Sequence, residues 1–118
     1  MEGQVSCVIE LAVKPSQLGA FKSSMEEMVA GTSSEPQTRN YEWYISSDGG
    51  TVHIYEKYAD SDAMITHVSG FMQKWAERFL AAVDPTRFTV YGSPSDAARE
   101  LLAGFGGTYL APWGGFAR

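Results

Sequence analysis

The order of apolar patterns along the sequence predicts an α+β fold. The expected arrangement is the ferredoxin-like order βαββαβ with a four-stranded antiparallel sheet, extended by a C-terminal helix and tail. One supporting observation is an Asp48-Gly49 pair between two runs rich in aromatic and β-branched residues, a strong signal for a β-hairpin. A second is the amphipathic helical pattern on each side of this hairpin. Short connections and right-handed crossovers then favour both long helices on one face of the sheet.

Length and composition are those of one globular domain that can bury its own core. The chain has 118 residues, of which 44% are hydrophobic and 13% aromatic, so disorder is excluded. A formal net charge of -5 argues against a nucleic acid or an anionic membrane as partner, because both favour a basic patch. The sequence shows no long apolar run and no signal-peptide pattern. We therefore expect a soluble, cytoplasmic protein.

Residues 4–14 alternate in the manner of a half-buried strand. One side of this strand carries Val5, Cys7, Ile9, Leu11 and Val13. Pro15 ends it, and the single cysteine is interpreted as a small core residue. From Ser16 an amphipathic helix follows, with apolar residues at helical spacing: Leu18, Phe21, Met25 and Met28. Gly31 and residues 32–36 end the helix and lead into the hairpin.

The hairpin between Thr38 and Tyr58 organises the rest of the predicted fold. If Asp48-Gly49 is a two-residue loop, the register pairs Ile45 with Val52, Trp43 with Ile54, Tyr41 with Glu56 and Arg39 with Tyr58. These residues share one face, and the other face carries Tyr44, His53, Glu42, Tyr55, Asn40 and Lys57. Neither face is a plain polar exterior. We therefore expect helices on one side and a partner or a ligand on the other.

After the hairpin, Asp60 is a suitable N-cap for a second helix. Apolar residues continue at helical spacing to about residue 83: Met64, Val68, Phe71 or Met72, Trp75 and Phe79. Gly70 is expected to break or bend this run into two pieces. By the same spacing, His67 shares the inward face of the apolar stripe.

The C-terminal part begins after Asp84-Pro85 with a short strand over residues 87–91. A capped helix start follows at Ser93-Pro94-Ser95-Asp96. The last stretch is rich in glycine but holds Phe105, Tyr109, Leu110, Trp113 and Phe116. We expect it to dock on its own domain or on a second subunit, and a partly disordered tail is the alternative. The chain thus divides into a main domain, residues 1–93, and a C-terminal helix and tail, residues 94–118.

Four groups of residues match the pattern of a known family in order and spacing. They are Glu35-Pro36, Asn40-Tyr41-Glu42-Trp43-Tyr44, Tyr55-Glu56-Lys57-Tyr58-Ala59-Asp60-Ser61-Asp62-Ala63, and His67. Over about residues 5–92 the chain resembles the antibiotic biosynthesis monooxygenase (ABM) superfamily. It departs from the family pattern at Gln37, where a glycine is usual, and at Tyr58, where a tryptophan is usual. The resemblance implies a dimeric α+β barrel with a pocket between sheet and helices in each subunit.

Members of this superfamily include cofactor-independent oxygenases that act on polycyclic phenols or quinols, haem-degrading oxygenases and isomerases of signal molecules. The fold therefore does not settle the function. The haem-degrading branch is disfavoured. It implies an asparagine on the first strand, where this chain offers only Gln4, and a tryptophan before the histidine, whereas Trp75 follows His67.

His67 is the main candidate for chemistry. An imidazole that faces the strands carrying Glu56 and Tyr41 can act as a general base, with these two as orienting groups. The alternative is a hydrogen-bonded core histidine, with Glu56 in a structural hydrogen bond to Arg39 or Tyr58.

Aromatic side chains are expected to line the same space. The predicted substrate-binding set is Trp43, Phe71, Trp75, Tyr58 and Arg39. Flat aromatic walls suit a planar phenol or quinone, and ordinary core packing is the alternative, favoured for Trp43. His53 points to the opposite face and is expected at a subunit interface. No Cys/His/carboxylate cluster has ligand spacing, so no metal is expected. The sequence also has no phosphate-cradling glycine-rich loop and no flavin fingerprint, so no cofactor is expected.

Three functional hypotheses follow. The first is a homodimeric, cofactor-independent monooxygenase-like protein that acts on a small aromatic or quinol-type molecule, whose deprotonated ring activates oxygen. The second is a non-catalytic dimeric barrel that binds a small hydrophobic molecule, in which His67 and Glu56 are structural. The third is a metabolite isomerase on the same scaffold.

Overall fold

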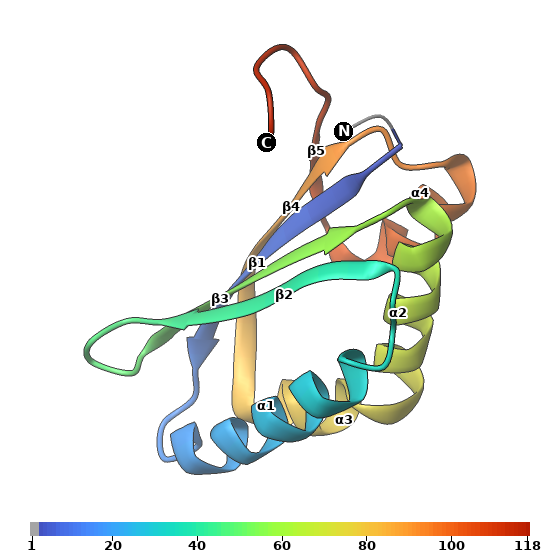
Figure 1. Ribbon diagram of the computed structural model, residues 1–118. Coiled ribbons are helices and arrows are strands. Elements are labelled where there is room, and N and C mark those ends of the chain that lie inside the picture. Colours follow the sequence, from blue (N-terminus) through green and yellow to red (C-terminus); the bar gives the residue numbers. More distant parts are fainter. Residues whose placement is uncertain (1–2) are drawn as a thin grey trace.

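The computed structural model describes residues 3–118 and shows one sheet covered by helices on one face (Figure 1). In chain order its elements are β1 (Val5–Val13), α1 (Leu18–Thr32), β2 (Thr38–Ile45), β3 (Thr51–Tyr58), α2 (Ser61–Lys74), α3 (Ala76–Ala82), β4 (Val83–Gly92), α4 (Asp96–Leu102), η1 (Ala103–Phe105) and β5 (Thr108–Leu110). The predicted α+β class and the order βαββαβ are confirmed. None of the helices in this part of the chain has both the length and the apolar composition needed to cross a membrane.

The sheet is mixed and five-stranded, with the order β2-β3-β1-β4-β5. β1 is central and pairs antiparallel with β3 and β4, as expected. The predicted purely antiparallel, four-stranded sheet was wrong, because β5 adds a parallel edge strand beside β4. Gly106 adopts a left-handed conformation (φ 67°) at the end of η1, which turns the chain back along this edge.

The hairpin register is confirmed for Ile45 with Val52, Trp43 with Ile54 and Tyr41 with Glu56. The connection is longer than the predicted two residues. The Ser46 N–H donates to the Thr51 carbonyl at 2.9 Å, so the loop spans residues 47–50. Gly49 takes the positive φ (74°) that the turn requires.

The expected Arg39–Tyr58 pairing was wrong. A bulge between Thr38 and Asn40 makes Thr38 the partner of Tyr58, because a bulge places an extra residue in one strand and shifts its register. Arg39 is exposed, and its guanidinium donates to the Pro36 carbonyl at 3.2 Å. The Arg39 guanidinium thus binds to the connection before β2, at the protein surface.

The second helical segment begins as predicted, because the Asp60 side chain accepts a hydrogen bond from the Ala63 N–H at 2.8 Å. The predicted break at Gly70 was wrong. α2 continues to Lys74, and the chain bends at Trp75, whose φ of -122° is not helical. A lone glycine costs a helix only about 1 kcal/mol, which tertiary packing readily offsets. Strand β4 begins directly after α3 and is longer than the predicted 87–91.

The core consists of two clusters of buried side chains. The first joins β1, β3, α2, β4 and α4 through Val5, Cys7, Tyr58, Met64, Val90 and Leu102. The second joins β1, α1, β3 and α3 through Leu11, Phe21, Met28, Ile54 and Phe79. Residues from both clusters line one cavity, which therefore lies between them.

The C-terminal segment packs on its own domain as far as β5. Ser95 is the N-cap of α4 and accepts from the Ala98 N–H. The Phe105 ring meets Phe88 edge-on at 6.1 Å, and the Arg99 guanidinium lies 4.4 Å from the centre of the Tyr109 ring. Beyond β5 the chain runs away from the sheet (Figure 1), and the side chains of Trp113 and Phe116 are largely exposed.

Candidate active site

A cavity of about 420 Å³ lies between the sheet and the helices. Its apolar lining includes Ile9, Met28, Ile54, Met64, Val68, Phe71, Phe79, Leu80, Phe88, Leu102 and Phe105. Four side chains with polar or titratable groups also line it: Cys7, Tyr41, Glu56 and His67. An apolar chamber with a few converging polar groups is the usual form of a small-molecule site.

His67 is held inside the protein by α2, whose stripe of Met64 and Val68 packs against the sheet. The residue is only 6% exposed, and each of its ring nitrogens faces a carboxylate. Nδ1 lies 3.0 Å from Glu35 Oε1, and Nε2 lies 3.7 Å from Glu56 Oε1. The predicted inward orientation of His67 is confirmed.

Glu56 sits on the inward face of β3 and is 4% exposed. Its Oε1 accepts a hydrogen bond from the Tyr58 hydroxyl and lies 3.8 Å from the Cys7 thiol. Burial raises the pKa of Glu56 above its ordinary value, while the charge of His67 and the hydrogen bonds from Tyr58 and Cys7 offset part of this rise. The carboxyl group can therefore exchange a proton closer to neutral pH than a surface glutamate.

Two tyrosines pack against the imidazole. The centre of the Tyr41 ring lies 5.1 Å from that of His67, and the centre of the Tyr58 ring lies 5.7 Å from it. Burial, followed by the negative charge of Glu56, raises the pKa of both phenols. They remain protonated at neutral pH and can donate hydrogen bonds.

The predicted site residues occupy different places. His67, Glu56, Tyr41 and Phe71 line the cavity, whereas Trp43, Trp75, Tyr58 and Arg39 are not among the described residues of its lining. Trp43 packs between Phe21 and Tyr41, with ring centres 5.6 and 5.7 Å away. Its buried indole N–H has no hydrogen-bond partner among residues 3–118. Trp75 lies at the bend between α2 and α3, under the Arg78 guanidinium.

Sequence reasoning missed two members of the polar cluster. Glu35 was noted only as part of the Glu35-Pro36 pair, and no local pattern shows that the α1–β2 connection returns over α2. Cys7 was assigned to the core, where it lies, but its contact with Glu56 comes from the pairing of β1 with β3. Burial raises the pKa of the Cys7 thiol, so it stays protonated. Across residues 3–118, no three His, Cys, Asp or Glu side chains are grouped as a metal site requires.

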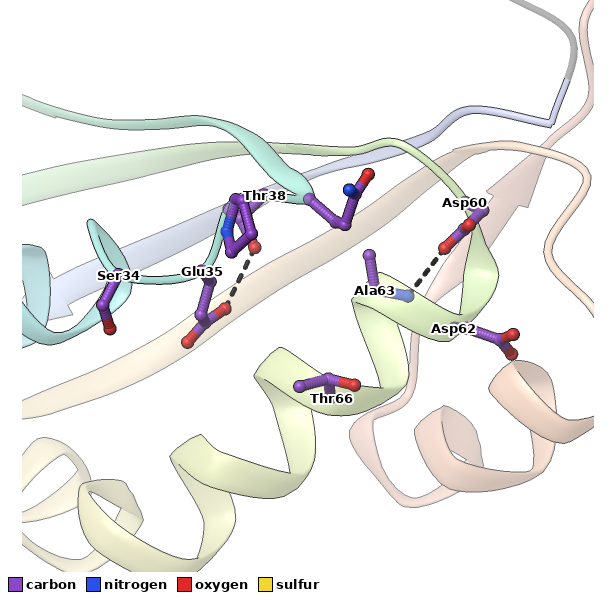
Figure 2. Close-up of a pocket in the computed structure, with 9 residues that line it drawn as sticks. Ser34, Glu35, Thr38, Asp60, Asp62, Ala63 and Thr66 are labelled. Carbon is purple, nitrogen blue, oxygen red and sulfur yellow. Dashed lines mark hydrogen bonds between the residues drawn. The ribbon is translucent and has the colours of Figure 1, made fainter.

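A second, shallower depression lies on the surface beside Glu35. It has a volume of about 400 Å³ and is lined by Ser34, Glu35, Pro36, Gln37, Thr38, Asp60, Asp62, Ala63 and Thr66. Figure 2 shows Glu35 and Thr38 on one side and Thr66 of α2 on the other. Glu35 thus connects this depression to the buried His67.

Comparison with known proteins identifies the fold and the family. The family model for antibiotic biosynthesis monooxygenases matches residues 4–84. This chain belongs to the antibiotic biosynthesis monooxygenase family. The match includes every element from β1 to α3, and with them Glu35, Tyr41, Glu56 and His67.

One relative of this chain is the Mycobacterium tuberculosis protein Rv0793, which is named as a proposed monooxygenase. It is 27% identical over 67 residues, which cover 57% of this chain and 66% of that protein. The match thus spans just under two thirds of the relative's length.

Two solved structures share the fold of this chain. MupZ from Pseudomonas fluorescens superposes with a TM-score of 0.87 at 22% identity, covering 98% of this chain and 94% of MupZ. SnoaB from Streptomyces nogalater, described as a cofactor-independent oxygenase, superposes with a TM-score of 0.66 at 16% identity, covering 79% of this chain and 95% of SnoaB. The likeness to MupZ therefore includes most of the C-terminal extension.

Proposed function

We propose that this protein is an acid–base enzyme that oxygenates a small aromatic or quinol-type molecule without a cofactor. The observation that supports it is the buried pair of Glu56 and His67 in the lining of an apolar cavity. A titratable pair in such a place is able to take a proton from a bound substrate. Family membership and the name given to SnoaB agree with this reaction class.

The chemistry begins with a proton transfer. The phenol or quinol binds among the apolar walls, and Glu56 together with His67 accepts its proton. Glu56 suits this role because burial raises its pKa toward neutrality. The Tyr41 hydroxyl orients the substrate oxygen as a hydrogen-bond donor. Phe71 forms a wall, while Trp43 and Tyr58 support Tyr41 and Glu56 from outside the cavity.

The deprotonated ring then supplies the electrons for oxygen. In the simplest balanced case, the substrate reacts as its keto tautomer, in which one ring carbon is a CH₂ group, and this group and O₂ give C=O and water. One oxygen atom stays in the product, and the other leaves as water with the two hydrogens lost from carbon. The substrate is the reductant, so the protein has to bind, deprotonate and exclude bulk water.

A metabolite isomerase is the second candidate. The pair of Glu56 and His67 can accept a proton at one carbon and return it at another, and this reaction needs no oxygen. The two candidates therefore share their catalytic residues and differ in whether O₂ is consumed.

The test is oxygen consumption with a panel of phenols and dihydroxynaphthalene-type quinols. Uptake that is lost in His67→Ala and His67→Asn but kept in His53→Ala would support the oxygenase. His53 is the matched control because it lies on β3 facing away from the cavity, 3.5 Å from Glu10. Conversion without oxygen uptake would favour the isomerase. Tight binding of these compounds without any conversion would overturn the enzyme proposal in favour of a binding barrel.

We also propose that the protein is a homodimer in which a second copy covers the outer face of the sheet. This face carries Tyr44, which is 58% exposed, and the exposed tail continues from its edge strand with Trp113 and Phe116. Exposed aromatic side chains of this kind favour association. Light scattering should give the mass of a dimer for the native chain and of a monomer for Tyr44→Glu. A native chain that stays monomeric at micromolar concentration would contradict the proposal.

A further inference from the structure

We propose that Glu35 is a proton-relay residue that connects the buried His67 to solvent. The inference rests on the proposed acid–base function and extends it to a residue outside the cavity. A base enclosed in an apolar chamber must return its proton to water before the next turnover. The structure offers a specific path for that return.

The path follows from the position of the imidazole between two carboxylates of unequal exposure. The Glu56 side chain, which faces Nε2, is 6% exposed, whereas the Glu35 side chain, which faces Nδ1, is 31% exposed. His67 and Glu56 line the inner cavity, and Glu35 lines the surface depression. The ring of His67 therefore spans the wall between the two spaces.

Glu35 also sets the tautomer of the histidine. When Glu35 is ionised and His67 is neutral, the carboxylate 3.0 Å away can only accept the Nδ1–H bond, because a carboxylate has no proton to donate. The lone pair of Nε2 then faces Glu56. This is the tautomer that can receive a proton from the cavity side.

The proton balance along the path is simple. The substrate proton reaches Nε2 through Glu56 and gives an imidazolium ion held between two carboxylates. The Nδ1 proton then passes to Glu35 and from there to water in the depression. A proton needed later in the cycle takes the reverse route, which restores the first tautomer of His67.

The surroundings keep the Glu35 carboxylate in place. The Thr38 hydroxyl donates to the same Oε1 atom at 3.0 Å (Figure 2). The backbone fixes this turn as well, since the Glu35 N–H donates to the Thr32 carbonyl at 2.9 Å and the Thr38 N–H donates to the Glu35 carbonyl at 3.1 Å. The depression also gathers polar residues around Glu35: Ser34, Gln37, Thr38, Asp60, Asp62 and Thr66.

Several titratable groups face His67 or its partners. Glu35 comes from the α1–β2 connection, Tyr41 from β2, and Glu56 and Tyr58 from β3. From β1, Cys7 reaches Glu56 but carries no charge when protonated. Among residues 3–118, the acidic side chains that face the imidazole are thus Glu35 and Glu56, and Glu35 is the more exposed of them.

The experiment compares Glu35→Gln with Asp62→Asn. Both replace a carboxylate in the depression, but Asp62 lies in the first turn of α2, whereas the acidic side chains that pair with His67 within residues 3–118 are Glu35 and Glu56. We expect kcat of Glu35→Gln to fall about tenfold or more, with KM unchanged and the pH profile of kcat altered. In Glu35→Ala, formate or another small acid should restore part of kcat. Asp62→Asn should behave as the native enzyme.

A second readout does not depend on turnover. Nitrogen-15 NMR of labelled histidine should show the proton of neutral His67 on Nδ1 in the native protein, and a shift of this population toward Nε2 in Glu35→Gln. If neither the tautomer nor kcat responds to Glu35→Gln, the relay is refuted while the roles of His67 and Glu56 stand. If His67→Asn leaves oxygen uptake intact, the proposed function fails instead, whatever the tautomer shows.

Discussion

Tyr58 donates its hydroxyl hydrogen bond to the same oxygen of Glu56 that faces His67. Tyr58 is 0% exposed, so this bond is shielded from water and fixes the carboxyl group that lines the cavity. The Tyr58 phenol thus supplies a hydrogen-bond donor to the buried acid.

Replacing the Tyr58 hydroxyl should shift the acid limb of the pH profile of kcat/KM. In Tyr58→Phe the ionised form of Glu56 loses a hydrogen bond, so the pKa of Glu56 should rise further. The acid limb of kcat/KM should therefore move to higher pH, and the protein should lose about 1–2 kcal/mol of stability. Tyr55→Phe is the control, because Tyr55 pairs with Val8 on the opposite face of β3. An unchanged acid limb in Tyr58→Phe would show that this hydrogen bond does not tune Glu56.

Glu56 should also make stability depend on pH. Its folded pKa is raised above the ordinary value of 4.5, so its favourable contribution is complete below pH 4.5. That contribution is lost as pH rises through the folded pKa, by about 1.4 kcal/mol for each pH unit between the two values. Urea unfolding should show native stability falling relative to Glu56→Gln over this interval. If the difference in free energy of unfolding between the native protein and Glu56→Gln stays constant with pH, the prediction is contradicted.

A phenylalanine in place of a valine should fit where the side chain lines the cavity, but not where it is closely packed in the core. Val68 lines the cavity, so Val68→Phe should fill part of it, weaken binding of a dihydroxynaphthalene by about tenfold, or 1.4 kcal/mol, and change stability little. Val90 is fully buried outside the lining. Val90→Phe should therefore cost about 1–3 kcal/mol through overpacking. Equal destabilisation of both variants would mean that the space near Val68 is filled in solution.

The docking of the C-terminal segment depends on a close approach at Gly107. A Cβ atom there would lie 2.8 Å from the Phe88 ring, whereas one at Gly104 would meet nothing within 4 Å. Gly107→Ala should destabilise the protein by about 1–2 kcal/mol and disturb the cavity wall that Phe88 forms. Gly104→Ala should do neither. Thermal unfolding of the two variants decides this, and equal melting temperatures would argue against a tightly packed β5.

Patterns of short range predicted most of the fold. Alternation in β1 and β3 and the turn at Gly49 determine the hairpin pairs down to Tyr41 with Glu56. Helical spacing predicts the inward orientation of His67, because both core stripe and imidazole lie on one side of α2. These features depend on neighbouring residues, which a single sequence displays.

The remaining features depend on contacts between distant segments. The bend at Trp75, and not at Gly70, brings Phe71 of α2 against Phe79 of α3, with ring centres 5.1 Å apart. Strand β5 has three residues next to glycines, and only its pairing with β4 makes it a strand. Glu35 joins the site because its connection folds over α2. None of these contacts has a local signature.

The central claim is that Glu56 and His67 form a catalytic acid–base pair inside the cavity. The most direct test is the kcat/KM of Glu56→Gln beside Glu42→Gln, with a quinol that the native enzyme converts. Glu42 is the matched control, because it pairs with Tyr55 on the outer face of the same hairpin. We predict a loss of about 100-fold or more for Glu56→Gln and a native value for Glu42→Gln. A folded Glu56→Gln enzyme with native kcat/KM would contradict the claim.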